Sequence, residues 1–282
     1  MIWTFVNNAF AEEGKAMIQT GDLAIQRGYA VFDYFRTVDH KPLFLEDYLD
    51  RFFNSAQALS ISIPHTRSRV TEIIFELIQK NNLPESGIRM IATGGYSPDS
   101  YTPVQGNFIL QQQPLQLPDA ATVENGIRIM THAYQRDLPT VKSINYLMGI
   151  WLQKQLKEKG LTDVLYIQND IISEFPRANI FIITPEGILV TPGRNVLAGI
   201  TRKKILEFAS TLLPVETRDI SVNELISAAE VFMTSTTKRI LPVTEIDGIR
   251  IGNGKAGPLT RQLLEQFIRL QQSATAPAHS PS

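Results

Sequence analysis

The sequence predicts an α/β protein of two parts: a small N-terminal α+β domain and a larger C-terminal domain that mixes strands and helices. The chain has 282 residues, enough for two domains of ordinary size. Segments of strand-like alternation are interspersed with segments of helical periodicity. The stretch QPLQLPDAAT has two prolines and no period, so it is interpreted as a linker. The predicted boundaries are 1–112 for the first domain, 113–122 for the linker, 123–272 for the second domain and 273–282 for a flexible tail.

In the first domain, β-branched or alternating residues predict strands at 3–6, 34–38, 88–93 and 107–111. Leu45, Leu49 and Phe52 recur at three- and four-residue spacing, which predicts a helix over 45–59. A second helix is predicted over 70–79.

In the second domain, the same signals predict strands at 126–131, 163–168, 179–184, 187–191 and 230–234. Helices are predicted at 145–159, 201–213, 222–228 and 255–270. Gly160 directly follows the first of these helices, as expected for a helix end. The last helix has an apolar stripe that includes Leu263 and Phe267.

Composition excludes several classes of protein. Hydrophobic residues make up 43% and charged residues 20%, which is typical of a globular chain. The formal charge of −1 indicates no nucleic-acid partner. The chain has no cysteine, no signal peptide at MIWTFVNNAF and no apolar run of about 18 residues. We therefore expect a cytoplasmic protein without membrane spans. No metal site is expected, because the histidines show no ligand spacing.

Three segments of the second half carry residues of complementary chemistry. Lys142, in TVKSINYL, precedes an apolar helix, a context that a solvated lysine does not require. Its amine can form a Schiff base with an aldehyde cofactor. Glu174, in ISEFPRANIF, can keep a pyridinium nitrogen protonated. Gly199-Ile200-Thr201 opens a helix whose N-terminus suits a phosphate. Together these are the functions that pyridoxal 5′-phosphate (PLP) requires of a protein.

In this order and spacing, the chain resembles the class IV aminotransferases, which include branched-chain and D-amino acid aminotransferases and aminodeoxychorismate lyase. Lys142 lies in a segment similar to the family's K-S-x-N-[YL]. Glu174 and Asn179 lie in a segment similar to S-E-x-x-x-x-N-[IVL]-F. The matches extend over residues 6–270. The resemblance implies PLP fold type IV, with a barrel-like sheet in the C-terminal domain and the cofactor bound between the domains. It also implies a homodimer in which residues of one subunit border the active site of the other.

The resemblance implies a role for each residue of the cofactor site. Lys142 is expected to be catalytic and to move the proton between substrate Cα and cofactor C4′. Tyr146 is expected to hydrogen-bond the phenolic oxygen, and Leu197 to pack against the ring. Arg51 is expected to bind the phosphate, although Tyr48 replaces the family's histidine nearby. The expected cofactor-binding residues are Arg51, Lys142, Tyr146, Glu174, Asn179, Leu197, Gly199, Ile200, Thr201, Ser235, Thr236 and Thr237.

The expected substrate-binding residues are Phe32, Arg36 and Arg89. Phe32 stands where branched-chain enzymes have Phe and D-amino acid enzymes have Tyr, and Arg36 fits the arginine that often ends this strand. Arg89 either lies near the substrate, as in branched-chain enzymes, or pairs with a neighbouring carboxylate. D-amino acid enzymes carry an Arg-x-His carboxylate trap where this chain has Asp99 and Tyr101. The charge at Asp99 argues against that specificity.

Two interpretations remain open for each of three basic residues, Lys238, Arg239 and Arg177. Lys238 and Arg239 stand where the family usually has small or acidic residues. They either form a solvated loop, the interpretation we prefer, or bind a substrate carboxylate, which would favour a dicarboxylic or aromatic-acid substrate. Arg177 faces either the substrate or solvent.

The predicted function is a PLP-dependent aminotransferase that moves an amino group from an amino acid, with a branched-chain-like preference, to a 2-oxo acid. The expected mechanism is ping-pong through Schiff bases. The alternative is aminodeoxychorismate lyase, which releases pyruvate and 4-aminobenzoate with the same lysine and carboxylate. Tyr146, Phe32 and Arg89 favour the aminotransferase.

Overall fold

The computed structural model describes residues 1–275, and these divide into two compact units. The first unit contains residues 1–116, 141–145 and 272–275. The second contains residues 117–140 and 146–271. The chain therefore leaves the second unit at Thr140, spends five residues in the first, and re-enters the second at Tyr146.

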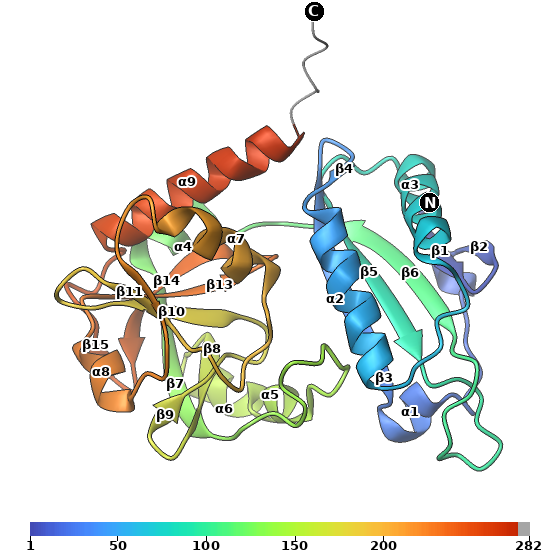
Figure 1. Cartoon of the computed structure of the whole chain (residues 1–282), viewed down its shortest axis with the longest axis horizontal. Coiled ribbons are helices and arrows are strands. Elements are labelled where there is room, and N and C mark those ends of the chain that lie inside the picture. The colour runs from blue at the N-terminus through green and yellow to red at the C-terminus, as the bar shows by residue number, and fades with distance from the viewer. Residues whose placement is uncertain (276–282) are drawn as a thin grey trace, which may run out of the picture. The chain divides into compact units, whose positions relative to one another are not determined.

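The first unit is a six-stranded antiparallel sheet with the strand order β2-β1-β6-β5-β3-β4 (Figure 1). Helices α2 and α3 lie across this sheet. The elements are β1 Trp3–Val6, β2 Ala9–Glu12, the 3-10 helix η1 Glu13–Lys15, α1 Leu23–Arg27, β3 Ala30–Val38, β4 Lys41–Pro42, α2 Leu45–Ala58, α3 Arg67–Asn81, β5 Ser86–Thr93 and β6 Phe108–Pro114.

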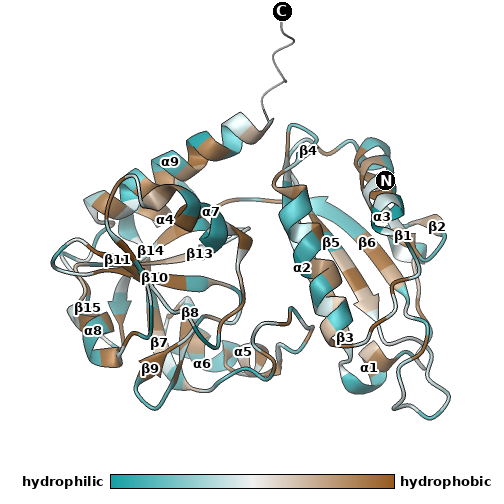
Figure 2. Ribbon diagram, in the orientation of Figure 1, coloured by the Kyte–Doolittle hydropathy of each residue, from teal (hydrophilic) through white to brown (hydrophobic). Residues whose placement is uncertain are grey.

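Helix α2 determines which face of β3 is covered. Its buried residues recur at three- and four-residue spacing and form one apolar stripe, and polar and apolar residues alternate along the helix in Figure 2. The Tyr48 ring of this stripe lies 5.8 Å from the ring of Phe35 on β3. Because side chains alternate along a strand, Asp33 shares the α2 face with Phe35, and Phe32 and Tyr34 lie on the opposite face.

The second unit is a nine-stranded sheet that curls into a half-barrel. The strand order is β12-β11-β10-β13-β14-β7-β8-β9, and β15 pairs with β14. The elements are α4 Ala120–Asn125, β7 Ile127–Ala133, α5 Leu147–Trp151, α6 Gln153–Glu158, β8 Asp163–Gln168, β9 Ile171–Ile172, β10 Asn179–Ile183, β11 Leu189–Thr191, α7 Ile200–Ala209, β12 Val215–Thr217, α8 Val222–Ser227, β13 Glu230–Ser235, β14 Arg239–Ile246, β15 Ile249–Arg250 and α9 Pro258–Thr275. This mixed architecture confirms the predicted fold class and the barrel-like sheet.

Two apolar clusters stabilise the half-barrel. The larger one joins β10, β13 and β14 through side chains such as Ile180, Met233 and Leu241. The smaller one packs Leu152 and Leu156 against β8. Burial of this kind is the main favourable term in folding.

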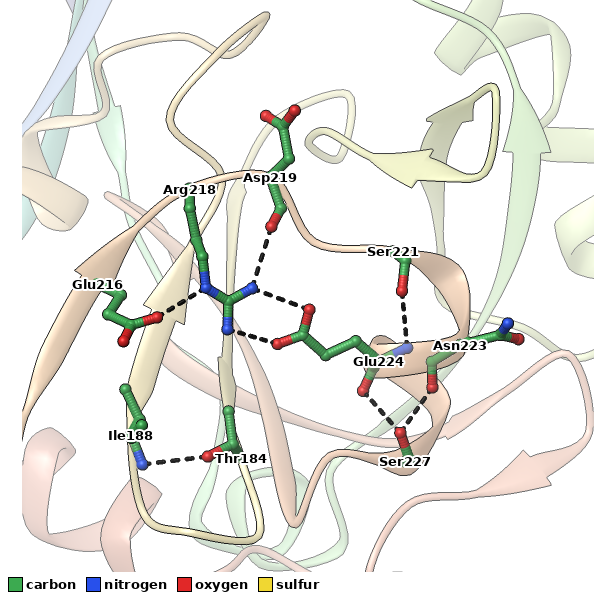
Figure 3. A network of polar contacts seen from close by, with 9 residues as sticks. All are labelled: Thr184, Ile188, Glu216, Arg218, Asp219, Ser221, Asn223, Glu224 and Ser227. Atoms are coloured by element: carbon green, nitrogen blue, oxygen red, sulfur yellow. Dashed lines mark hydrogen bonds and ion pairs between the residues drawn. The ribbon is translucent and has the colours of Figure 1, made fainter.

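A polar network holds the segment between β12 and α8 at the surface of the second unit (Figure 3). Arg218 makes a bidentate contact with Glu224 at 2.6 and 2.9 Å, and its Nε donates to Glu216 at 2.7 Å. These carboxylates raise the pKa of the Arg218 guanidinium. Ser221 caps α8 by accepting a hydrogen bond from the Glu224 N–H at 3.1 Å. The network therefore fixes the start of α8.

Several boundaries differ from the sequence-based expectations. The helix predicted over 145–159 is two helices, because the backbone of Leu152 has ψ −11 and interrupts the regular helix between α5 and α6. Two residues of the predicted linker continue β6 as far as Pro114, and α4 begins at Ala120. The tail was predicted to begin at Ser273, but α9 continues to Thr275. The rest of that tail lies outside the described residues.

Among residues 1–275, no helix is both long enough and apolar enough to cross a membrane.

Candidate active site

In the first unit, the segment 141–145 lies beside the start of β3. The Phe32 N–H donates a hydrogen bond of 3.0 Å to the Lys142 carbonyl, and a second backbone bond follows two residues later. The Lys142 N–H donates to Ser55 Oγ on α2 at 3.2 Å. These three bonds fix the backbone of the lysine against both the sheet and α2.

The Lys142 side chain lies against an aromatic ring on the face of β3 opposite α2. Its Nζ is 4.7 Å from the centroid of the Phe32 ring. The Arg89 guanidinium carbon lies 5.7 Å from the centroids of both Phe32 and Tyr34. Cations are attracted to aromatic faces at such distances. Within the described residues, no carboxylate forms an ion pair with Arg89, so the structure does not support that alternative. Lys142, Phe32 and Arg89 thus lie together.

Arg51 forms a buried ion pair on the opposite face of β3. Its Nε and Nη2 donate to the Asp33 carboxylate at 2.9 and 2.6 Å. Asp33 is fully buried and the Arg51 side chain is 10% exposed. The guanidinium also lies 5.3 Å from the Tyr48 ring centroid. Asp33 was not identified from the sequence as a partner of Arg51, and a role for Arg51 at a phosphate remains a prediction.

Arg36 is also engaged within the first unit. It is 3% exposed, and its Nη2 lies 3.0 Å from Glu85 Oε2. A substrate-binding role for Arg36 remains a prediction.

In the second unit, Glu174 is buried and receives hydrogen bonds from three groups. Arg136 Nη1 donates to Oε1 at 2.8 Å, and the Leu197 N–H donates to Oε2 at 2.9 Å. Asn179 Nδ2 lies 3.4 Å from Oε2. The Asn179 amide also donates to the Leu197 carbonyl at 2.9 Å. Three predicted residues, Glu174, Asn179 and Leu197, therefore form one hydrogen-bonded cluster.

Arg136 is the member of this cluster that sequence analysis missed. Its side chain is 9% exposed, compared with 4% for that of Glu174. It lies 38 residues before Glu174 in a segment without a recognisable motif, so no local signal identified it. Tyr166 lies close to the same charges, and burial raises the pKa of its phenol. The ion pair compensates the charge of the buried Glu174 carboxylate and fixes its orientation.

The N-terminus of α7 lies next to Asn179. Gly199 is the N-cap and has no side chain to satisfy the first N–H groups of the helix. A Cβ at this position would lie 1.9 Å from Asn179 Oδ1, so a larger residue does not fit without a shift. Thr201 in the first turn is 4% exposed, and Ile200 is buried beside it. These features are typical of an anion site, and a phosphate at this helix end remains a prediction.

The Ser235–Thr237 turn lies at the same end of the sheet. On β13, Thr234 is paired directly with Asn179 of β10. The residues that follow Thr234 are therefore close to the N-terminus of α7. Ser235 Oγ lies 3.4 Å from Thr237 Oγ1. The residue between them, Thr236, is half-buried. The second unit thus brings its two predicted phosphate elements together.

Tyr146 is half-buried and is the residue immediately before α5. Its predicted contact with the cofactor remains a prediction.

The preferred interpretation of Lys238 and Arg239 as a solvated loop is wrong. Lys238 Nζ donates to Asp163 Oδ2 at 3.2 Å, and its side chain is only 20% exposed. Arg239 is the first residue of β14, and its Nε donates to Gln271 Oε1 at 2.8 Å. A polar partner therefore holds each of these side chains within the second unit.

Asp99 and Arg177 also have defined positions. The Asp99 carboxylate accepts hydrogen bonds from Ser97 Oγ at 2.6 Å and from the N–H and hydroxyl of Thr102 at 2.8 and 2.6 Å. It therefore stabilises its own turn. Arg177 is exposed.

A polar hollow of 560 Å³ occurs elsewhere in the second unit, lined by residues that include Arg128, Arg250 and Lys255. None of its lining residues is one of the predicted site residues. Among residues 1–275, no group of three or more His, Cys, Asp or Glu side chains is placed to hold a metal ion.

Comparison with known proteins identifies the family. The family model for amino-transferase class IV matches residues 30–246. A Methanocaldococcus jannaschii protein, provisionally named a branched-chain-amino-acid aminotransferase, is 30% identical over 93% of this chain and 94% of its own. A D-alanine aminotransferase of Listeria monocytogenes is 28% identical over the same shares of the two chains. The branched-chain amino acid aminotransferase of Escherichia coli superposes with a TM-score of 0.90 at 26% identity, covering 99% of this chain and 97% of that one. The chain therefore belongs to the class IV aminotransferases, which are PLP-dependent enzymes.

Proposed function

We propose that this aminotransferase takes the amino group from an amino acid with an apolar, branched-chain-like side chain and passes it to a 2-oxo acid. The observation that carries the proposal is the half-buried Phe32 ring, which lies 4.7 Å from the Lys142 amine. An apolar surface beside the reacting amine favours an apolar substrate side chain. Arg89, which lies over the same ring, supplies a cation for the substrate carboxylate.

The residues present fit PLP on two observations in the second unit. The Gly199 N-cap leaves the first turn of α7 without a capping side chain. Thr234 Oγ1 is buried without a hydrogen-bond partner in the described part of the chain, directly before the Ser235–Thr237 turn. Helix N–H groups without a capping side chain, together with a buried hydroxyl, suit the oxygens of a phosphate group.

Each residue then has a defined task in the proposed mechanism. PLP supplies an aldehyde and an electron-accepting ring when it is bound. Lys142 would hold the cofactor through its amine, and the same Nζ would be the base that moves the substrate Cα proton. Glu174 would accept a hydrogen bond from the protonated ring nitrogen, and Arg136 orients the Glu174 carboxylate for this role. Thr201 and the Ser235–Thr237 turn bind the phosphate.

A half-reaction tests this proposal. The PLP-loaded enzyme is mixed with one amino acid at a time, without an oxo acid, and the cofactor absorbance is followed. L-Leucine and L-valine are expected to convert the cofactor at least about tenfold faster than D-alanine or L-aspartate, the range for pocket discrimination. Lys142→Ala should show no conversion with any donor. Faster conversion by D-alanine would overturn the branched-chain preference.

Phe32 can be tested by itself. Phe32→Ala should raise KM for L-leucine more than KM for L-alanine, because the lost contact is with the substrate side chain. Phe75→Ala, on the exposed side of α3, is the matched control. An equal effect on both substrates would remove Phe32 from the side-chain pocket.

The relatives named above are aminotransferases, and none of them is named a lyase. Release of pyruvate from aminodeoxychorismate, without conversion by any amino donor, would restore the lyase alternative. A homodimer and a cytoplasmic location are part of the same proposal.

A further inference from the structure

The loop that joins β13 to β14 is held by an ion pair between Lys238 and Asp163. Lys238 follows Thr237 directly, and its side chain returns into the second unit to reach Asp163, the first residue of β8. The Asp163 side chain is 5% exposed. Its other oxygen, Oδ1, accepts the Val164 N–H at 2.9 Å, which fixes the orientation of the carboxylate. Lys238 is therefore paired with a rigid, buried anion.

The backbone of Lys238 also belongs to the turn. The Lys238 N–H lies 3.2 Å from Ser235 Oγ and 3.4 Å from the Ser235 carbonyl oxygen. Ser235 is paired across the hairpin with Arg239. Arg239 has φ 57, a left-handed conformation that is uncommon for a residue with a Cβ. Such a conformation persists only where neighbouring contacts hold it. Lys238 directly precedes Arg239, and the ion pair with Asp163 fixes its side chain. This ion pair is therefore one of the contacts that hold the Arg239 backbone.

We infer that Lys238 is a positioning residue, which through its ion pair with Asp163 holds the Ser235–Thr237 turn in the conformation that binds the cofactor phosphate. This inference rests on the proposed phosphate role of the turn. Removing either partner leaves a largely buried charge without compensation, so the turn is expected to shift. Lys238 does not touch the phosphate in this scheme, and Asp163 is as important to the affinity as Lys238 is.

The test compares two ligands on apoenzyme prepared from the full-length holoenzyme. PLP and pyridoxal share the ring and the aldehyde, but pyridoxal lacks the phosphate. Lys238→Met and Asp163→Asn should each raise the Kd for PLP about tenfold, the value for one hydrogen bond to a charged group. Each should leave the Kd for pyridoxal unchanged within about twofold. The double variant should bind PLP no more weakly than either single variant, because both substitutions remove the same ion pair and the double variant leaves no uncompensated buried charge.

Lys154→Met is the matched control, since Lys154 lies in the same unit with its side chain 88% exposed. It should bind both ligands as the wild type does. If Lys238→Met does not fold, Asp163→Asn removes the same pair from the other end and gives the decisive Kd.

Three results would overturn the inference. Weaker PLP binding in Lys238→Met together with unchanged or tighter binding in Asp163→Asn would make Lys238 itself a phosphate ligand. Equal weakening of PLP and pyridoxal would indicate general damage to the second unit. Unchanged affinities would leave the pair without a role in binding. Failure of the wild type to bind PLP would instead refute the cofactor role of the turn, which separates the two proposals.

Discussion

Single residues determine the chemistry of the second unit through the charge that they keep in place. Glu174 and Arg136 are both largely buried, and each compensates the charge of the other. Replacing both partners of such a pair by neutral groups often costs little, but removing one partner is expensive. Arg136, which lies in no recognisable motif, is therefore as important to the stability of this cluster as the Glu174 carboxylate.

Arg136→Met should lower the free energy of unfolding by about 3–5 kcal/mol, because Glu174 then remains charged in a buried position. Urea denaturation measures this loss. The double variant Arg136→Met, Glu174→Gln should recover at least half of it, since no buried charge remains. A single variant as stable as the wild type would show that Glu174 is compensated by other groups.

Gly199→Ala should affect both stability and cofactor binding. The added Cβ would lie 1.9 Å from Asn179 Oδ1, and Asn179 also contacts Glu174 and Leu197. We expect a loss of about 1–3 kcal/mol, as for overpacking in a core. We also expect weaker PLP binding in an absorbance titration. Gly14→Ala is the control, because nothing lies within 4 Å of its added Cβ. Unaltered PLP binding would show that the N-terminus of α7 does not contact the cofactor.

Sequence reasoning found the residues that lie within short motifs and missed those defined by a distant partner. Glu174, Asn179 and Gly199 each occur in a local pattern, and the structure places them together. The pairs Arg51–Asp33 and Lys238–Asp163 join residues 18 and 75 positions apart. Neither spacing corresponds to neighbouring positions on one helix or strand. Only the folded chain reveals them.

Elements of secondary structure show the same limit. Strand β8 was predicted with its observed bounds, because its apolar run is bounded by turn residues. Strand β14 was missed. It contains Pro242, and proline argues against a central strand because it cannot donate a ladder hydrogen bond. In the structure, Pro242 is paired with Phe232 of β13, and the ladder to β7 shifts register between Val243 and Glu245. A bulge next to the proline tolerates it.

The turn that contains Asp99 should give the first unit a pH-dependent contribution to stability. Hydrogen bonds from Ser97 and Thr102 lower the pKa of the Asp99 carboxyl in the folded state. The unfolded carboxyl titrates at about pH 4, so the ionised form stabilises the fold above that pH. This contribution is lost as the pH falls through the lowered pKa of the folded state.

We therefore expect the stability difference between the wild type and Asp99→Asn to be constant from neutral pH to about pH 5 and to shrink below about pH 4. Urea denaturation at a series of pH values measures it. Asp137→Asn is the control, because that exposed carboxylate has no hydrogen bond to another described residue. A difference that stayed constant at the lowest pH would contradict the assignment.

At the scale of the whole molecule, the exposed side of α5 is the surface that we expect to bury in the proposed homodimer. Leu147, Ile150 and Trp151 on this short helix are 76%, 68% and 67% exposed. Contiguous apolar groups of this size commonly mark a protein interface.

The double substitution Ile150→Asp, Trp151→Asp should convert a dimer of twice 31.6 kDa into a monomer. Light scattering coupled to size-exclusion chromatography measures the mass. Phe75→Asp, which places the same charge on an exposed apolar position of α3, should leave the dimer intact. A wild type that elutes as a monomer would refute the homodimer, and a variant that stays dimeric would place the interface elsewhere.

The path of the chain has a consequence for dissecting this enzyme. Lys142 belongs to five residues that rejoin the first unit after 24 residues of the second, residues 117–140, have already been made. A gene fragment that stops at Gln116 therefore encodes the sheet and its helices but not the amine, and the complementary fragment encodes the amine without the strand that pairs with it. Recombination at this point would therefore separate Lys142 from β3 in either fragment. Lys142, the proposed catalytic lysine, stays together with its strand partner only in the uninterrupted polypeptide.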